Sequence, residues 1–176
     1  PGKYDVPGPS LATSWSVSAD GKTWTFKLRT DAKFHSGNPV TAADVVYSLG
    51  RVVTLKETPS FILTQFGITP DSLKAIDTHT VQITLDKQYA GGIFLACLAS
   101  GVTGIVDSKV VQSHAKKTDK HPKGDMGLTW LSTNEAGSGS FIMRKWAKND
   151  RVILDAFSGH WGNVPKLKRV VVKEIN

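Results

Sequence analysis

The sequence predicts an α+β fold in which antiparallel strands carry flanking helices. Three patterns point to this class: two alternating apolar and polar segments joined by a turn, a capped amphipathic helix after them, and further strand pairs later in the chain. The chain has 176 residues, of which 40% are hydrophobic. This is enough for one sizeable core or two small ones, and it excludes a disordered chain.

The first strand pair surrounds the sequence SADGK. Apolar residues alternate with polar ones on both sides of it: Trp15 and Val17 before the turn, then Trp24, Phe26 and Leu28 after it. Asp20 and Gly21 supply the turn, because an Asp-Gly pair favours a two-residue type I′ turn in which both central residues have positive φ. We expect a β-hairpin with its aromatic residues on one face.

A helix is expected to begin at Ala42, after the loop that ends at Pro39. Thr41 is placed as the N-cap, and Asp44 stands three residues later, where its charge favours the free N–H groups of the first turn. Burial of each apolar residue at helical spacing would contribute about 1.5–3 kcal/mol, so this helix should pack on the hairpin. These apolar residues are Val45, Val46, Leu49, Val52 and Val53.

Two more strands are expected in residues 72–77 and 80–86, on either side of a polar turn. Residues 90–99 are small and apolar, which suits a short buried helix, and Cys97 would be a buried structural thiol there. As the only cysteine, it excludes an intrachain disulfide and leaves the cellular compartment open. After Asp107 or Ser108 as a cap, the segment KVVQSHAKK indicates a surface helix.

Regular patterning weakens between residues 116 and 134, apart from the short apolar run LTWL. This polar, glycine-containing segment is the longest irregular part of the chain, and we place a domain boundary at its end. Order then returns with strands expected at residues 140–146 and 151–157, about the turn AKND, and a third at 167–175.

The charge of the chain is compatible with an acidic partner. Lys and Arg number 22 against 15 for Asp and Glu, which gives a net charge of +7. A basic nucleic-acid-binding module is therefore one alternative class of function. The densest basic group nevertheless alternates with apolar residues, as the exposed face of a strand does. Its members are Lys166, Lys168, Arg169 and Lys173.

Neither a membrane span nor a leader is indicated. The longest apolar run, residues 93–99, falls well short of the roughly 20 residues that cross a bilayer. The chain begins with Pro1 and shows no basic segment followed by an apolar one. We expect either that a signal peptide has been removed or that the chain is a piece of a longer protein.

The motifs that suggest catalysis are incomplete. Residues 136–140, AGSGS, look like a phosphate-binding loop, but a Walker loop needs Lys followed by Ser or Thr and then a helix, whereas Phe141 leads into a strand. A close backbone approach permitted by glycine is the simpler explanation. Ser138 and Ser140 have no triad partner visible in the sequence, so a hydrolase is an alternative without support.

No metal or cofactor site is indicated either. His35 has no carboxylate or second histidine at metal-ligand spacing, and His114, His121 and Asp125 lie across the irregular segment. We therefore expect no catalytic residue, no metal and no cofactor.

Three tryptophans lie in strand patterns, where burial in the core is more common than stacking on bases or sugars. These are Trp15, Trp24 and Trp146.

Several blocks of the sequence resemble one family. The stretch LATSWSVSADGKTWTFKLRTDAKFHSGNPVTAADVVYSLGR holds the expected hairpin and helix start, and it resembles the signature of the family 5 extracellular solute-binding proteins, the peptide and nickel receptors of ABC importers. The blocks AIDTHTVQITL, AGSGSF and DRVILDAFSGHWGNVPKLKRVVVK are similar to further blocks of that family. Ser140 stands where the family usually has Pro. The resemblance covers nearly the whole chain.

This resemblance implies a fold and an architecture. Family members have a periplasmic-binding-protein-like fold (type II, cluster C), with two lobes that close on the ligand and a smaller subdomain inserted in the first lobe. By this resemblance, residues 1–134 are the inserted small subdomain and residues 135–176 start the return into the main part of the first lobe. The second lobe would be absent from this chain.

The resemblance also implies a function without catalysis. The chain would belong to the substrate-binding component of an ABC importer, which captures a short peptide or related small solute outside the cytoplasmic membrane. Its partners would be that solute and the transmembrane permease of the importer, with no nucleic acid, and we expect a monomer. The location would be periplasmic, or extracellular with a lipid anchor. Dipeptide, oligopeptide, opine, sugar and metal chelate all stay open as the ligand.

Ligand contacts are expected where the family's pocket approaches this subdomain. Three segments are implied: SFILTQF, ASGVTG and residues 137–140. For the two phenylalanines of the first segment, a place in the subdomain core is the alternative. The residues expected to bind ligand are Phe61, Gln65, Phe66, Ser100, Gly101 and Gly139.

Overall fold

The computed structural model describes residues 7–173 and confirms the α+β class. Contacts divide the described chain into two compact units. The first comprises the described residues up to Thr30 together with Thr41–Ile105, and the second comprises Asp31–Val40 together with the residues from Val106 onward. This division does not coincide with the boundary expected at residue 134, because the irregular segment 116–134 lies inside the second unit.

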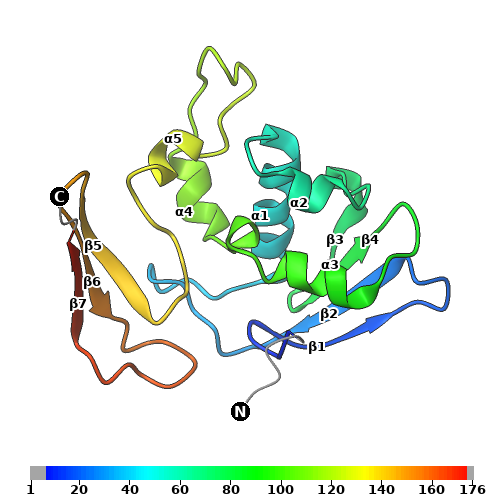
Figure 1. Cartoon of the computed structure of the whole chain (residues 1–176), viewed down its shortest axis with the longest axis horizontal. Coiled ribbons are helices and arrows are strands. Elements are labelled where there is room, and N and C mark those ends of the chain that lie inside the picture. The colour runs from blue at the N-terminus through cyan, green and yellow to red at the C-terminus, as the bar shows by residue number, and fades with distance from the viewer. Residues whose placement is uncertain (1–6, 174–176) are drawn as a thin grey trace. The chain divides into compact units, whose positions relative to one another are not determined.

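The first unit is built on a four-stranded antiparallel sheet (Figure 1). The apolar residues of its two central strands face one side and are buried, as their alternation predicts. In spatial order the strands are β1 (Ala12–Val17), β2 (Thr23–Leu28), β4 (Thr80–Thr84) and β3 (Leu73–Asp77).

The turn between β1 and β2 differs from the expected two-residue type I′ turn. Gly21 has the expected positive φ, 70°, but Asp20 does not have a positive φ. The loop is longer, because the Ser18 N–H donates to the Thr23 carbonyl at 2.9 Å and the Gly21 N–H donates to the Ser18 carbonyl at 2.9 Å. The Asp20 carboxylate accepts from the Ser18 hydroxyl and the Lys22 N–H, which stabilises this wider turn.

Helix α1 (Ala42–Leu55) begins at the expected residue. The Asp44 carboxylate accepts hydrogen bonds from the Thr41 N–H at 2.9 Å and from the Thr41 hydroxyl at 2.6 Å, as part of a capping box. The backbone of the helix lies nearest to β3 and β4, and its buried side chains share one core with those of β2, so the expected packing on the hairpin is confirmed for β2. The strand order accounts for the nearest strands, since β4 pairs with β2 and brings β3 and β4 beneath the helix.

Short helices complete the core of the first unit. They are α2 (Phe61–Thr64), η1 (Pro70–Ser72), α3 (Gly91–Leu98) and η2 (Gly101–Thr103). The expected helix at residues 90–99 is therefore confirmed, although only Phe94 of α3 is buried and Cys97 is half-buried. Phe94 packs against Trp24 and Phe66, with ring centroids 5.2 Å apart in both pairs.

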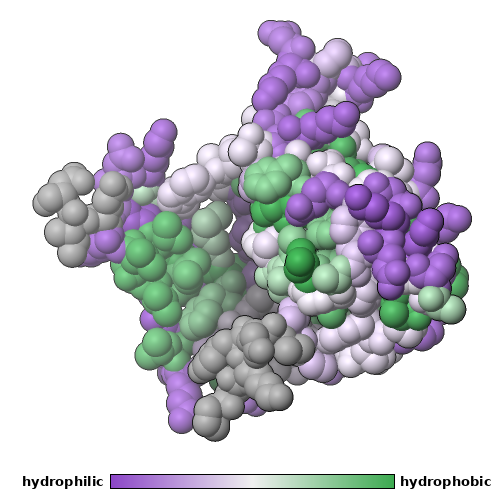
Figure 2. All heavy atoms as spheres, turned by 45° about the vertical axis from the view of Figure 1, so that its right-hand side comes forward, coloured by the Kyte–Doolittle hydropathy of each residue, from purple (hydrophilic) through white to green (hydrophobic). Residues whose placement is uncertain are grey.

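The second unit contains helices α4 (Ser108–Ser113) and α5 (Leu128–Leu131) and the antiparallel sheet β5 (Phe141–Ala147), β6 (Arg151–Ala156) and β7 (Arg169–Lys173). The three strands were expected. Apolar side chains gather over this sheet (Figure 2). Trp146 is 50% exposed, so its expected burial was wrong, because no described helix packs extensively on this sheet.

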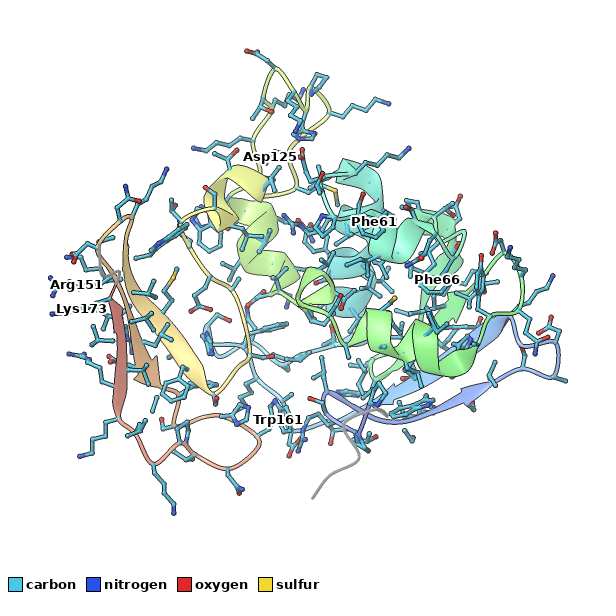
Figure 3. All side chains as sticks on the ribbon, viewed as in Figure 1. Phe61, Phe66, Asp125, Arg151, Trp161 and Lys173 are labelled. Carbon is cyan, nitrogen blue, oxygen red and sulfur yellow. The ribbon has the colours of Figure 1, made fainter. Side chains whose placement is uncertain are left out.

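Asp125 organises the irregular segment between α4 and α5 (Figure 3). Its buried carboxylate accepts from the backbone N–H groups of Lys116 at 2.8 Å, Gly127 at 3.0 Å and Thr129 at 3.0 Å. Burial alone would raise the pKa of Asp125, but these hydrogen bonds to the ionised form outweigh it and hold the pKa far below the usual range.

Within residues 7–173, no helix is both long and apolar enough to span a membrane.

Candidate functional site

The site begins with a tight loop formed by residues 33–39. The Phe34 N–H donates to the Asn38 carbonyl at 2.9 Å, and the Gly37 N–H donates to the Phe34 carbonyl at 2.9 Å. Gly37 has a φ of 91°, a conformation that side chains with a Cβ rarely adopt. This closed loop presents the side chains of His35 and Ser36 to the rest of the second unit.

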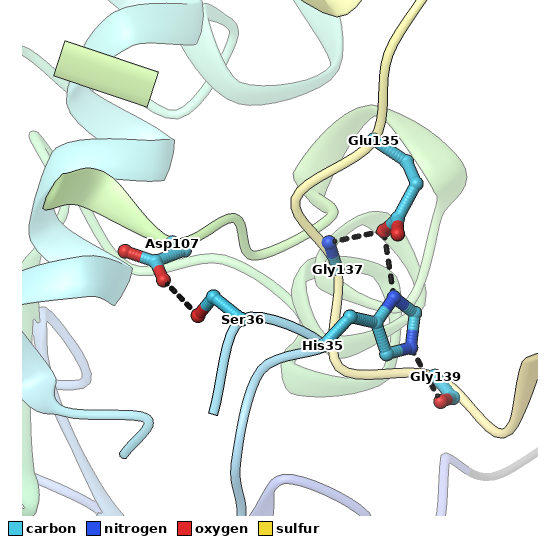
Figure 4. A network of polar contacts seen from close by, with 6 residues as sticks. All are labelled: His35, Ser36, Asp107, Glu135, Gly137 and Gly139. Carbon is cyan, nitrogen blue, oxygen red and sulfur yellow. Dashed lines mark hydrogen bonds and ion pairs between the residues drawn. The ribbon is translucent and has the colours of Figure 1, made fainter. Parts of the chain in front are cut away.

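Asp107 anchors this loop to the start of α4 (Figure 4). Its carboxylate accepts from the Ser36 hydroxyl at 2.5 Å and from the Asn38 side-chain amide at 2.8 Å. It also caps α4, as expected, by accepting from the N–H groups of Lys109 and Val110. Burial would raise the pKa of Asp107, but the hydrogen bonds outweigh it and lower that pKa. The loop is thereby held by an ionised carboxylate.

His35 connects the loop to the segment that leads into β5, residues 135–140, which we call the lead-in segment (Figure 4). The His35 Nδ1 atom lies 2.7 Å from Glu135 Oε2, and its Nε2 atom lies 2.8 Å from the Gly139 carbonyl oxygen. The backbone N–H of His35 donates to the Gly137 carbonyl at 2.9 Å, and the Gly137 N–H donates to Glu135 Oε2 at 2.8 Å. One residue therefore contacts three positions of the lead-in segment.

The electrostatics of this pair favour an ion pair. Burial would lower the pKa of His35, but the hydrogen bonds to Glu135 and to the Gly139 carbonyl outweigh it and raise that pKa. Burial would likewise raise the pKa of Glu135, yet the bonds from His35 and the Gly137 N–H lower it. The side chains are 8% exposed for His35 and 26% exposed for Glu135, so water screens the pair only in part.

The lead-in segment presents exposed backbone at Gly139. Gly139 is exposed, and a Cβ built on it would meet no atom within 4 Å. Among residues 7–173, no acceptor pairs with the N–H groups of Ser138 or Gly139. The Ser140 carbonyl, in contrast, accepts from the Phe157 N–H at 2.9 Å. Free N–H groups on a segment whose position is fixed by other hydrogen bonds can bind a carboxylate or a peptide carbonyl.

The two phenylalanines expected at the ligand have different environments (Figure 3). Phe61 is 62% exposed, whereas Phe66 is 1% exposed and belongs to the core, which was the alternative for both. Gln65 lies between them in the chain and is exposed. Its side-chain amide donates to the Ile62 carbonyl at 3.1 Å and approaches the sulfur of Cys97 at 3.7 Å.

Ser100 and Gly101 lie at the start of η2, and Gly101 is exposed. The Ser100 carbonyl accepts from the Thr103 hydroxyl at 2.8 Å, but the Ser100 hydroxyl oxygen is buried without a partner in the described residues. A buried hydroxyl without a partner is costly, and a ligand or water could satisfy it. These two residues belong to the first unit together with residues 61–66, and Gly139 belongs to the second.

An apolar pocket that the sequence did not reveal lies in the first unit. It has a volume of about 340 Å³ between β1, β2 and β4 on one side and α1, α3 and η2 on the other. Its apolar residues read as ordinary core positions in the sequence, so no signal distinguished them. None of the expected ligand residues lines it. The side chains around it include Trp15, Phe26, Leu49, Ile83, Leu98 and Ile105.

Metal binding finds no geometric support in residues 7–173, which contain no cluster of three or more His, Cys, Asp and Glu side chains placed to hold an ion. His114, His121 and Asp125, which were considered together as metal ligands, do not form one site. His114 stacks on Trp130, with ring centroids 4.4 Å apart, and Asp125 is occupied by backbone N–H groups.

Comparison with known proteins gives a consistent result. Residues 6–176 match the family model described as bacterial extracellular solute-binding proteins, family 5 Middle. The probable D,D-dipeptide-binding periplasmic protein DdpA of Escherichia coli (strain K12) is 38% identical over 176 residues. That alignment covers 99% of this chain and 31% of the relative, so the chain spans less than a third of its length.

Two solved structures share the fold. The periplasmic binding protein DppA from Helicobacter pylori, in complex with the peptide STSA, is 28% identical with a TM-score of 0.76, over 98% of this chain and 35% of that one. NikZ from Campylobacter jejuni, in complex with Ni(L-His), is 26% identical with a TM-score of 0.74, over 95% of this chain and 30% of that one. The expected periplasmic-binding-protein-like fold is therefore confirmed.

Proposed function

Because this chain belongs to the bacterial extracellular solute-binding proteins of family 5, we propose that it is part of the substrate-binding component of an ABC importer. Its role is to help capture a short peptide or a related small solute outside the cytoplasmic membrane. The match of residues 6–176 to the family model carries this proposal. The name of the E. coli relative, which refers to a D,D-dipeptide, and the peptide bound to H. pylori DppA favour a peptide ligand.

The site supports binding without chemistry. Among residues 7–173, the N–H groups of Ser138 and Gly139 in the lead-in segment have no acceptor, and the ionised side chains of His35 and Glu135 are engaged with each other and with the backbone. Such groups hold a surface in shape and are not free to exchange protons with a bound molecule. The family consists of substrate-binding transport proteins, and we propose that this chain has no enzymatic activity of its own.

We propose a partner and a location on the same basis. The relatives include periplasmic binding proteins, so the chain acts in the periplasm, or outside the cell with a lipid anchor. It delivers its ligand to the transmembrane permease of the importer, acts as a monomer and binds no nucleic acid. No metal or cofactor takes part.

The proposed architecture keeps residues 1–134 as the inserted small subdomain and residues 135–176 as the start of the return into the first lobe. The exposure of the β5–β7 sheet supports the second part of this proposal, a sheet that continues into a larger lobe. Trp146, Val171 and Val172 are 50%, 46% and 56% exposed, which is unusual for a strand in a complete domain. We propose that the chain is a piece of a longer protein, whose remaining residues cover this sheet and form the second lobe.

Ligand contacts are proposed for the exposed members of the expected set. Phe61 offers an exposed ring, Gln65 an exposed amide, and Gly101 and Gly139 exposed backbone. Ser100 offers its unpartnered hydroxyl. Phe66 is too buried to reach a ligand, so we assign it a supporting role in the core of the first unit.

Calorimetry on the chain and on its full-length parent tests the function. D-alanyl-D-alanine and the peptide STSA are suitable first probes, followed by any ligand that native mass spectrometry detects on the purified parent. We expect tight binding by the parent and none at millimolar concentration by the chain alone. Most of the ligand's surface is enclosed only when two lobes close on it, and the chain alone lacks the second lobe. Micromolar binding by the chain would show that it holds a complete site, and a parent that binds no solute would refute the function.

A further inference from the structure

The His35 imidazole faces two hydrogen-bond acceptors and no donor among the residues that contact its nitrogens. Nδ1 lies 2.7 Å from a Glu135 carboxylate oxygen and Nε2 lies 2.8 Å from the Gly139 carbonyl oxygen. A carbonyl oxygen can only accept, and an ionised carboxylate can only accept. Both ring nitrogens must therefore donate, which requires the imidazolium form of His35.

Loss of the ring proton would break one of these two hydrogen bonds. A neutral imidazole keeps a single N–H, so one nitrogen would present its lone pair to an oxygen less than 3 Å away. If Nε2 loses the proton, the Gly139 carbonyl is released. If Nδ1 loses it, the Glu135 carboxylate is released, and this carboxylate also holds the Gly137 N–H. Either outcome loosens the lead-in segment.

The remaining contacts leave His35 little freedom to turn away. Its ring packs edge-on against Phe157, with centroids 4.9 Å apart and an interplanar angle of 77°. Its backbone N–H is bonded to the Gly137 carbonyl, and its side chain is 8% exposed. The change therefore falls on the segment that the ring holds, which includes the exposed Gly139.

The charged groups around His35 define the direction of the effect. Glu135 in the lead-in segment favours the imidazolium, and Arg144 in β5 opposes it, while Phe157, which follows β6, is uncharged. Because the pKa of His35 is raised above its ordinary value of 6.5, the bridging form is complete at acidic pH and is lost as the pH rises through the folded-state pKa.

We propose that His35 is a positioning residue for ligand binding: its imidazolium bridges Glu135 and Gly139, holds the lead-in segment in its binding conformation, and makes ligand affinity fall when raised pH removes the ring proton. This inference rests on the proposed function, in which the lead-in segment contacts the ligand. It assigns His35 no contact with the ligand itself.

The first test needs no ligand. Nitrogen-15 NMR of the imidazole rings in this chain should show two protonated nitrogens for His35 at about pH 6, and the amide resonances of Gly137 and Gly139 should shift with the same midpoint as the ring. In Glu135→Gln the midpoint should move to lower pH, because the charge that favours the imidazolium is gone. A bare ring nitrogen at pH 6, or glycine resonances that ignore the titration, would overturn the proposal.

The second test measures affinity for D-alanyl-D-alanine by calorimetry on the full-length parent, between about pH 6 and pH 9. We expect the dissociation constant to rise about tenfold across this range, equivalent to about 1.4 kcal/mol. His35→Gln should bind more weakly at pH 6 and lose the pH dependence, whereas a defect that is only structural would leave the dependence in place. His79→Gln, in the turn between β3 and β4, is the matched control and should keep the parent's profile.

The two tests separate the proposal from the function on which it rests. If the first test succeeds and the parent binds none of its probes or co-purified solutes, the proposed function fails while the proton-linked bridge stands. If the parent binds its probe with an affinity that stays constant while NMR shows His35 losing its proton, the positioning role fails and the function stands.

Discussion

Replacement of Phe66 by Ala tests whether the ring is part of the core of the first unit. Phe66 is 1% exposed and meets the rings of Tyr89 and Phe94 edge-on, with centroids 4.9 and 5.2 Å away. Truncation removes these contacts and leaves a void next to Phe94, which the surrounding core holds in place.

The expected cost follows from this geometry. Truncation of a buried phenylalanine costs about 3–5 kcal/mol, and the two aromatic contacts place Phe66→Ala in the upper half of that range, at about 4 kcal/mol. For a chain of this size, each kcal/mol lowers Tm by roughly 2–4 °C. Phe66→Ala should therefore lower Tm by roughly 8–16 °C.

Phe61→Ala is the matched control, since the same side chain is removed five residues away. Phe61 is 62% exposed, so its truncation should change stability by no more than about 0.5 kcal/mol. Urea unfolding followed by circular dichroism measures both variants, with an unchanged m-value as the check that only stability has changed. Equal losses for the two variants would refute the assignment of Phe66 to the core and of Phe61 to the surface.

Three further predictions concern a turn, a buried carboxylate and the basic surface. Gly21→Val should cost roughly 1–3 kcal/mol, because Gly21 has a φ of 70° and a Cβ there would lie 2.5 Å from Gln88 Cγ; Gly92→Val, where no atom lies within 4 Å, should cost much less, and equal melts would disprove the turn geometry. Asp125→Asn should lower the urea midpoint at pH 7. Since the pKa of Asp125 is lowered, its stabilisation is present above the unfolded value near 3.9 and fades below it, so a variant difference that does not shrink on acidification would contradict the role of the charge. Nucleic acid should bind weakly, without sequence preference and only at low salt, as measured by fluorescence anisotropy across a salt series. Tight binding to one sequence at physiological salt would contradict the receptor function.

The elements that could be predicted from the sequence are those specified by neighbouring residues. Thr41 and Asp44 stand three apart and form the capping box of α1, and the alternation around Val81 and Ile83 places both in the buried face of the first sheet. The Asp-Gly pair correctly indicated a turn with positive φ at Gly21. These signals depend on neighbouring residues, so the packing of the rest of the chain does not change them.

Packing partners could not be predicted in the same way. The β1–β2 hairpin and α1 are consecutive and share a core through β2, but the backbone of α1 lies nearest to β3 and β4, because β4 pairs beside β2. Trp146 has the alternation of a core residue and is half exposed. Alternation reports which face of a strand is apolar, and it does not report whether another layer covers that face.

The two phenylalanines expected at the ligand show the same limit at shorter range. Phe61 and Phe66 lie in one apolar segment, SFILTQF, and nothing in their composition separates them. The helix α2 that carries Phe61 has four residues, which is too short for a helical periodicity to assign faces. The burial of Phe66 depends on Phe94, which comes 28 positions later and packs against it.

His35 is the extreme case, and it shows why the candidate site was only partly visible in the sequence. Its partner Glu135 lies 100 residues away, so no spacing rule could join them. Each residue had an ordinary local interpretation: a histidine in a loop, a carboxylate at the end of an irregular segment. The structure joins them because Asp107 fixes the loop through Ser36 and Asn38 while it caps α4. Because the ring then faces two oxygens that can only accept, the protonation state of His35 follows from tertiary structure, and so does the shape of the segment that presents Gly139.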